Sequence, residues 1–353
     1  MRAAGPPSVG SAGSPAHGRA RLGPPRPGRL PLDPARFFAA SRLVIVAGKG
    51  GVGKTVVTAT LARAAARAGL SSLVVEVEGK SGLATMYGQQ ALAYDEAVLF
   101  AGGGPTGEGE VRARTITPDE ALLDYLRDHG LSRISKRLVS SGALDVVATA
   151  APGIKDILIL GKVKQLERAG VADLLILDAP AAGHAITFLQ AARALLDTVR
   201  VGPINAQAKE VLELLTDHTR CRVMLVTLPE ETPVNELVDT AFSLEDRVGI
   251  GLAPVVVNGL YDGLPGLGTA PEAAAAAADT TLRSGEAYVL AAAAAFRVDR
   301  TALQEEQLGR LAEQLPLEQL RLPFVFTTEI GAEELDDLAD RLLAEIERLP
   351  EVV

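Results

Sequence analysis

Short apolar runs alternate with longer amphipathic stretches from residue 42 almost to the end of the chain. The runs are apolar at consecutive positions, as in parallel strands that are covered on both faces. They have the length of strands and lie at 42–48, 72–78, 173–180, 222–229, 253–258 and 322–327. Strands that alternate with helices predict a doubly wound α/β fold with a mostly parallel sheet. Ligands of such folds bind at the carboxyl ends of the strands.

Helical patterns fill the intervals between the runs. The clearest is an apolar stripe at 3.6-residue spacing near the end of the chain, formed by Leu335, Leu338, Ala339, Leu342, Leu343, Ile346 and Leu349. Residues 118–170 and 186–217 carry more helix than plain alternation requires, and we expect them to form an added helical layer. Residues 261–300 are rich in Ala and Gly, which predicts a variable, partly mobile insertion.

The first 36 residues differ in composition from the rest of the chain. Residues 1–35 hold 14 Gly and Pro together with scattered arginines. Such a segment buries too little apolar surface to offset its ordering entropy, so we expect a disordered tail over 1–36. A basic arm that touches anionic lipid or RNA is the alternative, although no aromatic residue lies among the arginines. Residues 41–348 are then expected to form a single domain.

Composition narrows the class of protein. The 353 residues are 48% hydrophobic and carry a net charge of −9, which allows a sizeable core and argues against broad nucleic-acid binding. A single cysteine, Cys221, can form neither an intrachain disulfide nor a C-x-x-C zinc site. We expect no membrane-spanning helix and no signal peptide, because strongly apolar runs are absent. These features indicate a reducing cytoplasm, with a peripheral position at a membrane left open.

The segment GKGGVGKT at 48–55 follows the first apolar run and precedes a helical pattern. Its spacing G-x-x-x-x-G-K-[ST] predicts a loop that cradles phosphates. Lys54 would reach the β- and γ-phosphates, and Thr55 would ligate Mg²⁺. Backbone N–H groups at the start of the helix would hold the phosphates from Gly48, Lys49, Gly50, Gly51, Val52 and Gly53. A glycine-rich helix start without a ligand is the alternative.

A second lysine, Lys49, follows the first glycine of this loop. It resembles the signature lysine of the deviant Walker A ATPases, in which this residue crosses a dimer interface and contacts the partner's nucleotide. The resemblance implies a nucleotide-sandwich dimer in which Lys49 acts in trans. The alternative is a solvated lysine whose charge is merely useful beside phosphates.

Further motifs resemble one branch of that class. LILDAPAAGH (175–184), APGIKD (151–156), LVTLPEETPVNE (225–236) and VVVNGLY (255–261) resemble segments of the ArsA-like family, which comprises arsenite-pump ATPases and the ATPases that target tail-anchored membrane proteins. The resemblance covers residues 41–348. It implies an ATP- and Mg²⁺-dependent ATPase that pairs with itself or a related subunit and couples hydrolysis to an unknown client, for which a membrane protein is one candidate.

The same resemblance assigns roles to single residues. Asp178 would lie near Mg²⁺ and its waters, with a strand-end helix cap as the alternative. Asn258 would read the adenine, Glu230 would contact the nucleotide, and residues 325–330 would lie over the base. Glu78 aligns with the aspartate that orients the attacking water. Because a glutamate is one methylene longer, it must sit further back, which favours slow turnover; a plain strand-end charge is the alternative.

Two departures concern cargo and turnover. Ala182 stands where the family has a threonine near the γ-phosphate. With one cysteine and three methionines, the chain lacks the family's metalloid cysteines, its zinc C-x-x-C and its Met-rich client groove, so we expect neither arsenite nor zinc to bind. The segment VEVEGKSGLA (75–84) resembles a bacterial subfamily of paired ArsA-like proteins. A nucleotide-binding regulatory or scaffold subunit with low turnover is the alternative function.

Overall fold

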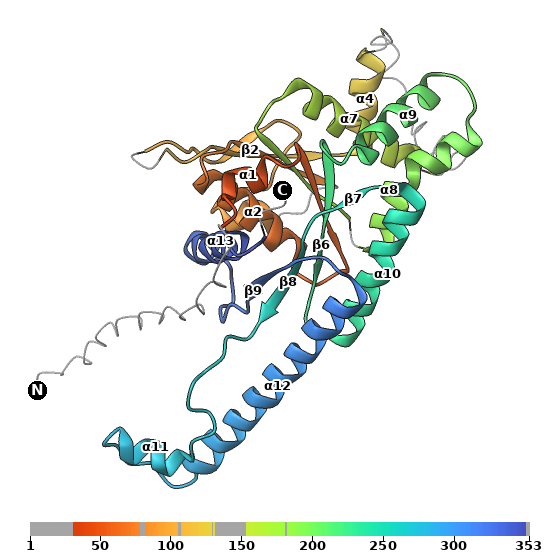
Figure 1. Ribbon diagram of the computed structural model, residues 1–353. Coiled ribbons are helices and arrows are strands. Elements are labelled where there is room, and N and C mark those ends of the chain that lie inside the picture. Colours follow the sequence, from red (N-terminus) through yellow and green to blue (C-terminus); the bar gives the residue numbers. More distant parts are fainter. Residues whose placement is uncertain are drawn as a thin grey trace, which may run out of the picture.

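The computed structural model describes residues 31–77, 82–104, 107–128, 130, 153–180 and 182–350, without the side chains of 182–184. Within these residues, nine strands form one sheet at the centre of the protein (Figure 1). The strands are β1 (Leu43–Gly48), β2 (Ser72–Val77), β3 (Ala97–Phe100), β4 (Val111–Ile116), β5 (Leu174–Asp178), β6 (Cys221–Thr227), β7 (Gly251–Leu252), β8 (Val255–Leu260) and β9 (Gln319–Pro323).

The sheet has the order β3-β4-β2-β5-β1-β6-β8-β9, with β7 also paired to β6. The pairings recorded among these strands are parallel except that of β3 with β4. β1 lies between β5 and β6. The strands from β2 to β5 lie on one side of β1 in the sheet, and β6, β8 and β9 lie on the other side. The carboxyl end of β1 is therefore a topological switch point, where doubly wound folds bind ligands.

Helices cover both faces of the sheet (Figure 1). Their bounds are α1 (Pro34–Phe38), α2 (Lys54–Arg67), α3 (Gly82–Met86), α4 (Pro118–Asp128), α7 (Ile154–Ala169), α8 (Ala182–Thr198), α9 (Pro203–Thr216), α10 (Glu231–Val248), α11 (Pro271–Ala277), α12 (Glu286–Gln314) and α13 (Ala332–Ile346). The doubly wound α/β fold that the apolar pattern predicted is thus confirmed. None of the described helices is both long enough and apolar enough to cross a bilayer.

Two apolar clusters hold the layers together. Leu43 and Ile45 of β1 belong to the cluster that includes Ile157 of α7 and Phe188 of α8. Val46, which points to the other face, belongs to the cluster that includes residues of α2 and α13. Consecutive strand residues are therefore buried on opposite faces, which explains why the predicted strands are apolar without alternation.

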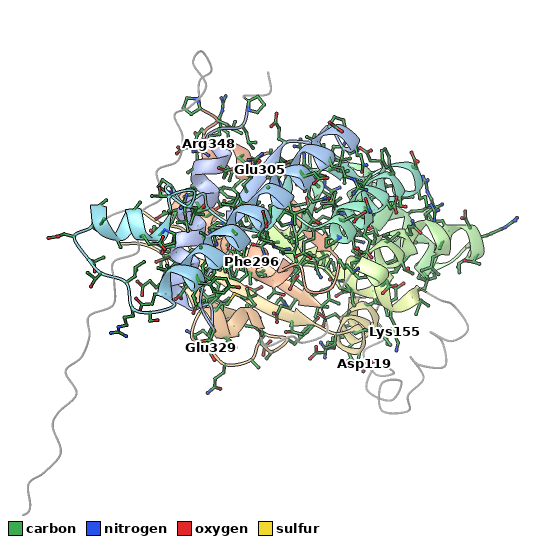
Figure 2. The ribbon with its side chains drawn as sticks, turned by 90° about the horizontal axis from the view of Figure 1, so that it is seen from below. Asp119, Lys155, Phe296, Glu305, Glu329 and Arg348 are labelled. Atoms are coloured by element: carbon green, nitrogen blue, oxygen red, sulfur yellow. The ribbon has the colours of Figure 1, made fainter. Side chains whose placement is uncertain are left out.

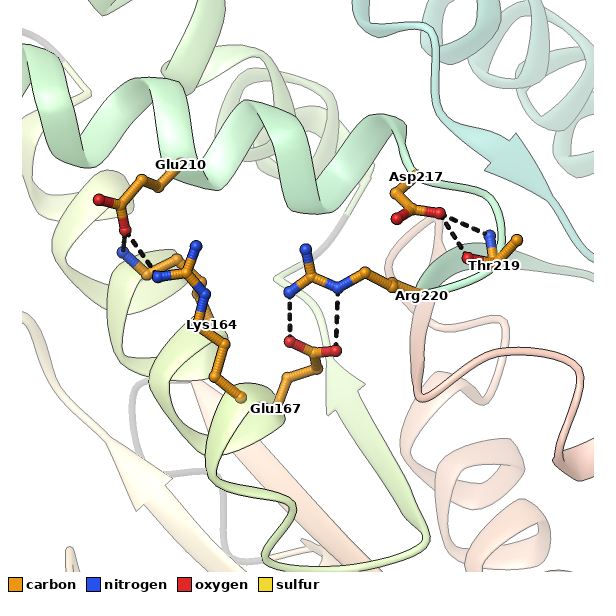
Figure 3. Close-up of polar contacts among 7 residues, drawn as sticks. Lys164, Glu167, Glu210, Asp217, Thr219 and Arg220 are labelled. Atoms are coloured by element: carbon orange, nitrogen blue, oxygen red, sulfur yellow. Dashed lines mark hydrogen bonds and ion pairs between the residues drawn. The ribbon is translucent and has the colours of Figure 1, made fainter.

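α4, α7, α8 and α9 lie largely within 118–170 and 186–217, while residues 131–152 lie outside the described residues; that these helices form an added layer of the domain stays a prediction. Ion pairs connect the helices α7 and α9 to each other and connect α7 to the start of β6 (Figure 3). The buried Lys164 of α7 donates to Glu210 of α9 at 2.6 Å. Glu167 of α7 accepts from Arg220, which directly precedes β6, at 2.5 Å. These contacts fix α7 between α9 and the sheet.

The helix α12 is the longest described element and carries the Ala-rich segment away from the body. α11 lies at the far end of α12 from the sheet, and the two form a projecting arm (Figure 1). Sequence patterning predicted a variable insertion over 261–300; the structure places α11 and the first half of α12 in this range. The variability and mobility of the segment stay predictions, as do the domain limits 41–348.

Several expected boundaries need correction. The run at 322–327 was expected to be a strand, but β9 ends at Pro323 and leaves Phe324 and Phe326 exposed. The tail expected over 1–36 lies outside the described residues up to 30, and α1 already begins at Pro34. β3 and β4 were not expected, because β3 is only four residues long and two arginines interrupt the apolar pattern of β4.

Candidate functional site

The loop 48–55 connects the carboxyl end of β1 to the first turn of α2. Gly48 lies so close to β6 that a Cβ atom there would meet the carbonyl oxygen of Val226 at 2.3 Å. Gly53 precedes α2 in the left-handed conformation, with φ +88°, and a Cβ atom there would meet Nδ2 of Asn258 at 2.3 Å. The shape of this loop therefore requires glycine at both positions.

Lys54 is the first residue of α2 and folds back over the loop. Its Nζ donates to the carbonyl oxygen of Lys49 at 3.1 Å, and only 7% of the residue is exposed. The ammonium group thus lies against the loop backbone at a helix N-terminus, where the helix dipole and free N–H groups favour an anion. The residues present fit a phosphate-binding site.

The Thr55 hydroxyl donates to Oδ2 of Asp178 at 2.8 Å. Asp178 is the last residue of β5, the strand beside β1, and its side chain is buried. A hydroxyl and a carboxylate oxygen this close form part of the hard oxygen set that Mg²⁺ prefers, with waters and phosphate oxygens completing the shell. The structure thus brings together two residues, 123 positions apart, that were both expected at a magnesium site.

A second buried carboxylate lies next to Asp178. Glu76 of β2 is in register with Asp178 in the parallel pairing of β2 and β5, so both side chains lie on the same face of the sheet. Only 1% of Glu76 is exposed. Two neighbouring buried carboxylates favour a nearby cation. Sequence reasoning missed Glu76, although a charged residue inside an otherwise apolar strand was an available signal.

Asn258 lies near the end of β8 and contacts the loop from the other side. Its amide Nδ2 donates to the carbonyl oxygen of Val52 at 3.0 Å. Beyond it, the rings of Tyr261 and Phe326 stack with centroids 5.7 Å apart, and Phe324 packs edge-on against both. Phe326, in the segment expected over the base, thus stacks on Tyr261, three residues after Asn258, and the aromatic cluster was not anticipated from the sequence.

Two other predicted residues are held by partners from elsewhere in the chain. Glu230 directly precedes α10, and its carboxylate accepts from Arg300 of α12 at 2.5 Å. Lys49 pairs with Glu236 of α10 at 2.6 Å, with 41% and 43% of the two side chains exposed. Glu236 was not singled out in the sequence, because nothing in its local pattern indicates a partner so distant.

The remaining predictions concern Glu78, Ala182 and Cys221. Glu78 and the side chain of Ala182 lie outside the described residues, so the roles given to them stay predictions. Cys221 lies buried in β6, and burial raises the pKa of its thiol. A soft metal ion would need a thiolate at that position. Among the described side chains, no group of three or more His, Cys, Asp or Glu could hold a metal ion.

Residues 41–201 match the family model of the anion-transporting ATPases, the ArsA ATPase family. The chain is 34% identical over 226 residues to ATPase BagA of Mycobacterium tuberculosis, and the match covers 62% of this chain and 64% of that protein. It is 28% identical over 238 residues to a candidate arsenical pump-driving ATPase of Halobacterium salinarum, covering 62% of this chain and 35% of the relative. ATPase GET3 of Paracoccidioides lutzii is 28% identical over 151 residues, 42% of each chain.

These similarities confirm the ArsA-like resemblance seen in the motifs, and together with the parallel sheet they confirm the P-loop NTPase fold. The match to BagA spans 64% of that relative's length, and the other two matches span smaller shares of theirs. The family match ends at residue 201, so α9, β6, α10 and the arm lie beyond it.

Proposed function

We propose that this chain binds ATP together with Mg²⁺ and hydrolyses it to ADP and phosphate within a dimer. The observation that carries the proposal is the Thr55–Asp178 hydrogen bond of 2.8 Å at the start of α2, directly beside Lys54. A hydroxyl, a carboxylate and an ammonium group at the end of a glycine-rich loop are what a nucleotide with bound metal requires.

Lys54 and the loop would hold the phosphate chain. The N–H groups at the N-terminus of α2 have no partners within the helix and are oriented by the helix dipole towards an anion. Lys54 already lies against the carbonyl oxygen of Lys49, so a small rotation of its side chain would direct Nζ to the β- and γ-phosphates. Both sources of positive charge act on the same oxygens.

Thr55 and Asp178 would hold the metal ion, Thr55 directly and Asp178 directly or through water. Mg²⁺, when bound, would neutralise the charge that develops on the phosphate oxygens during transfer. The buried position of Asp178 at the end of β5 fixes its carboxylate relative to the loop. Glu78, which follows β2 in the sequence, would orient the attacking water.

Asn258 and Glu230 would position the nucleoside. Asn258 already packs against the loop through Val52, and its amide can both donate to and accept from a purine edge. Lys49 would reach the nucleotide of the partner subunit, which is a second copy or a related ArsA-like chain. The cycle of binding and hydrolysis would open and close the dimer for an unknown client, in the cytoplasm or at a membrane surface.

A nucleotide-binding regulatory subunit with low turnover is the second candidate. The observation that favours it is the ion pair between Lys49 and Glu236, because this contact engages within one chain the lysine that would act on the partner. Glu78 in place of an aspartate points in the same direction.

Phosphate release by the purified chain with Mg²⁺ and ATP tests the proposal, measured alone and after mixing with a related subunit. Hydrolysis that Lys54→Ala abolishes would support the enzyme. Tight ATP binding without phosphate release under both conditions would favour the regulatory subunit. Absence of ATP binding in the folded protein would contradict both.

A further inference from the structure

Six large apolar side chains lie exposed along the helix α12, and three of them share one face. Val289, Phe296 and Leu303 follow one another at intervals of seven residues, and they are 63%, 66% and 53% exposed. Residues seven positions apart lie two turns apart on the same face of a helix. We call the row formed by Val289, Ala292, Phe296 and Leu303 the α12 seam; Phe296 is labelled in Figure 2.

The body of the protein packs against a different face of α12. Gln304, Leu308 and Leu311 are buried, and they lie on the face turned towards α10 and the sheet. Among the described residues, those of the seam remain exposed, since the helix projects beyond the body at this point (Figure 1). Exposed apolar rows of this length are unusual on a monomer and mark interaction surfaces.

Polar contacts hold α12 in a fixed position. Gln304 accepts from the backbone N–H of Tyr261 at 2.8 Å and donates to the carbonyl oxygen of Gly259 at 3.1 Å. Arg300 pairs with Glu230 at 2.5 Å. The helix that carries the seam is therefore anchored to the body at its Leu303 end, which reduces the conformational freedom that a partner must restrict.

We propose that the α12 seam binds the α12 seam of a second copy of this chain. The heptad spacing identifies the partner as a helix, because large side chains at this interval fit between the side chains of a facing helix. Ala292 separates Val289 from Phe296 and leaves room for a large side chain of the other copy. A row that offers both large and small residues is complementary to itself, as a two-fold interface requires.

The charges that border the seam fit a second copy better than a membrane surface. Asp299 lies on the seam face between Phe296 and Leu303, and Arg300 lies beside that face, so both signs occur along the seam. A helix that lies on anionic lipid has a border rich in Lys and Arg, and the mixed border here is different. Two copies of a border with both signs can align without a uniform like-charge repulsion.

The apolar area that the seam exposes is large enough for an association of moderate strength. Tyr288, next to the seam, and the three large seam residues would each bury roughly 100–200 Å² in contact with a partner. Two copies would then bury on the order of 1,000 Å² in total, the lower end of specific interfaces. The seam therefore predicts reversible pairing at micromolar concentration, without nucleotide.

Pairing would also tether the two loops 48–55 within one complex. β8 ends at the same edge of the sheet as β1, and the arm leaves the body directly from that end. Paired arms would raise the effective concentration of the loop 48–55 of one copy near that of the other copy. This consequence rests on the proposed function, whereas the pairing itself does not.

Sedimentation of the full chain without nucleotide tests the inference. We expect a dimer that dissociates on dilution, and we expect Phe296→Asp to be monomeric at the same concentrations. Phe242→Asp is the matched control, because Phe242 is an exposed phenylalanine of α10, away from the arm. Circular dichroism and ATP binding of both variants report on folding and on the nucleotide site separately.

A spin label on Val298→Cys provides a second readout, because Val298 is exposed half a turn from the seam and Cys221 is buried. We expect an intermolecular distance that disappears in the Phe296→Asp background. A wild-type chain that stays monomeric without nucleotide would overturn the inference. A dimer that survives Phe296→Asp in a folded protein would also overturn it. Loss of ATP binding in the unaltered chain would instead count against the proposed function.

Discussion

The Thr55 hydroxyl donates a hydrogen bond to Oδ2 of Asp178 over 2.8 Å. Thr55 comes from the loop after β1 and Asp178 ends β5, so the contact exists only because these strands are neighbours in the sheet. Side chains that sequence motifs assign to one metal site are thus placed together by the topology. Hydrogen bonding between them also orients both oxygens before any ligand arrives.

Removal of the Thr55 hydroxyl should weaken metal-dependent nucleotide binding. Thr55→Val keeps the shape of the side chain but loses a metal ligand and the partner of Asp178. We expect the affinity for ATP measured with Mg²⁺ to fall by roughly tenfold or more, in the range typical of lost metal-site contacts. Affinity measured with excess EDTA should change little, because the phosphate contacts of Lys54 remain.

Thr55→Ser is the matched control, since it keeps the hydroxyl and should bind Mg²⁺ and ATP almost as the unaltered chain does. Equal losses for Thr55→Val with and without Mg²⁺ would show that the hydroxyl acts on the loop alone and holds no metal.

Release of Lys49 from Glu236 should favour nucleotide-driven pairing. The two side chains are about half exposed, so their ion pair is worth only about 0.2–1 kcal/mol. Glu236→Gln removes this competition, and we expect association in the presence of ATP to strengthen by up to about fivefold. Analytical ultracentrifugation with ATP measures it, with Asp239→Asn on the exposed side of α10 as control. Unchanged or weaker association would mean that the pair does not restrain Lys49.

The amide of Asn258 should matter for nucleotide affinity. Asn258→Leu removes the hydrogen bond to the carbonyl oxygen of Val52 and any polar contact with a base. An unpaired polar group in a buried site costs about 1–3 kcal/mol, so we expect ATP affinity to fall roughly fivefold to hundredfold. Isothermal calorimetry with ATP measures the loss, and thermal unfolding checks that the loop stays folded. Affinity equal to that of the unaltered chain would place the base elsewhere.

The stability of the helical layer should depend on pH through Glu210. Hydrogen bonding from Lys164 holds the pKa of Glu210 below its ordinary value of 4.5. A carboxylate whose pKa is lowered by folding stabilises the folded state at pH values above its unfolded pKa. This contribution disappears as the pH falls through the lowered pKa of the folded state. Glu210→Gln should therefore lower the free energy of unfolding at neutral pH, by about 1 kcal/mol for such a partly exposed pair.

Urea unfolding at neutral pH and well below pH 4.5 checks this dependence. The difference between the unaltered chain and Glu210→Gln should shrink at the lower pH. Glu213→Gln, an exposed carboxylate of the same helix, should show no such difference. A loss that is equal at both pH values would mean that Glu210 acts through packing.

The sequence predicted the covered strands and the strand–loop–helix arrangement at 42–67 well, because each depends on local patterns. β4 was missed for a physical reason: Arg112 and Arg114 interrupt its apolar pattern, yet the Arg114 guanidinium packs over the ring of Tyr94. The last strand was predicted at 322–327 instead of Gln319–Pro323, because Phe324 and Phe326 are residue types that favour strands. In the structure they form an aromatic cluster with Tyr261. Aromatic residues fit strands and exposed clusters equally well when only the sequence is known.

The proximity of residues in the candidate site was predictable only where sequence motifs place them at the ends of neighbouring strands. Lys54, Thr55 and Asp178 follow from spacing and strand ends, whereas the contact of Lys49 with Glu236 joins residues 187 positions apart. Two half-exposed charges leave no periodic signal, so this contact required the packing of α10 against the loop. The α12 seam could not be predicted either, because the sequence of an Ala-rich helix does not indicate which of its faces the rest of the protein leaves exposed.

The central claim is that two chains complete each hydrolytic site, with Lys49 of one chain acting on the nucleotide of the other. Lys49→Ala and Glu78→Gln chains should each bind ATP, and each alone should release almost no phosphate. In a mixed dimer, the Glu78→Gln chain supplies Lys49 to the site that keeps its Glu78.

Phosphate release by an equal mixture of the two variants is the most direct test of this claim. We expect each mixed dimer to recover up to about half of the activity of the unaltered dimer, because one site in two is competent. A mixture that stays inactive while the two chains demonstrably associate would contradict the claim and place Lys49 in its own site.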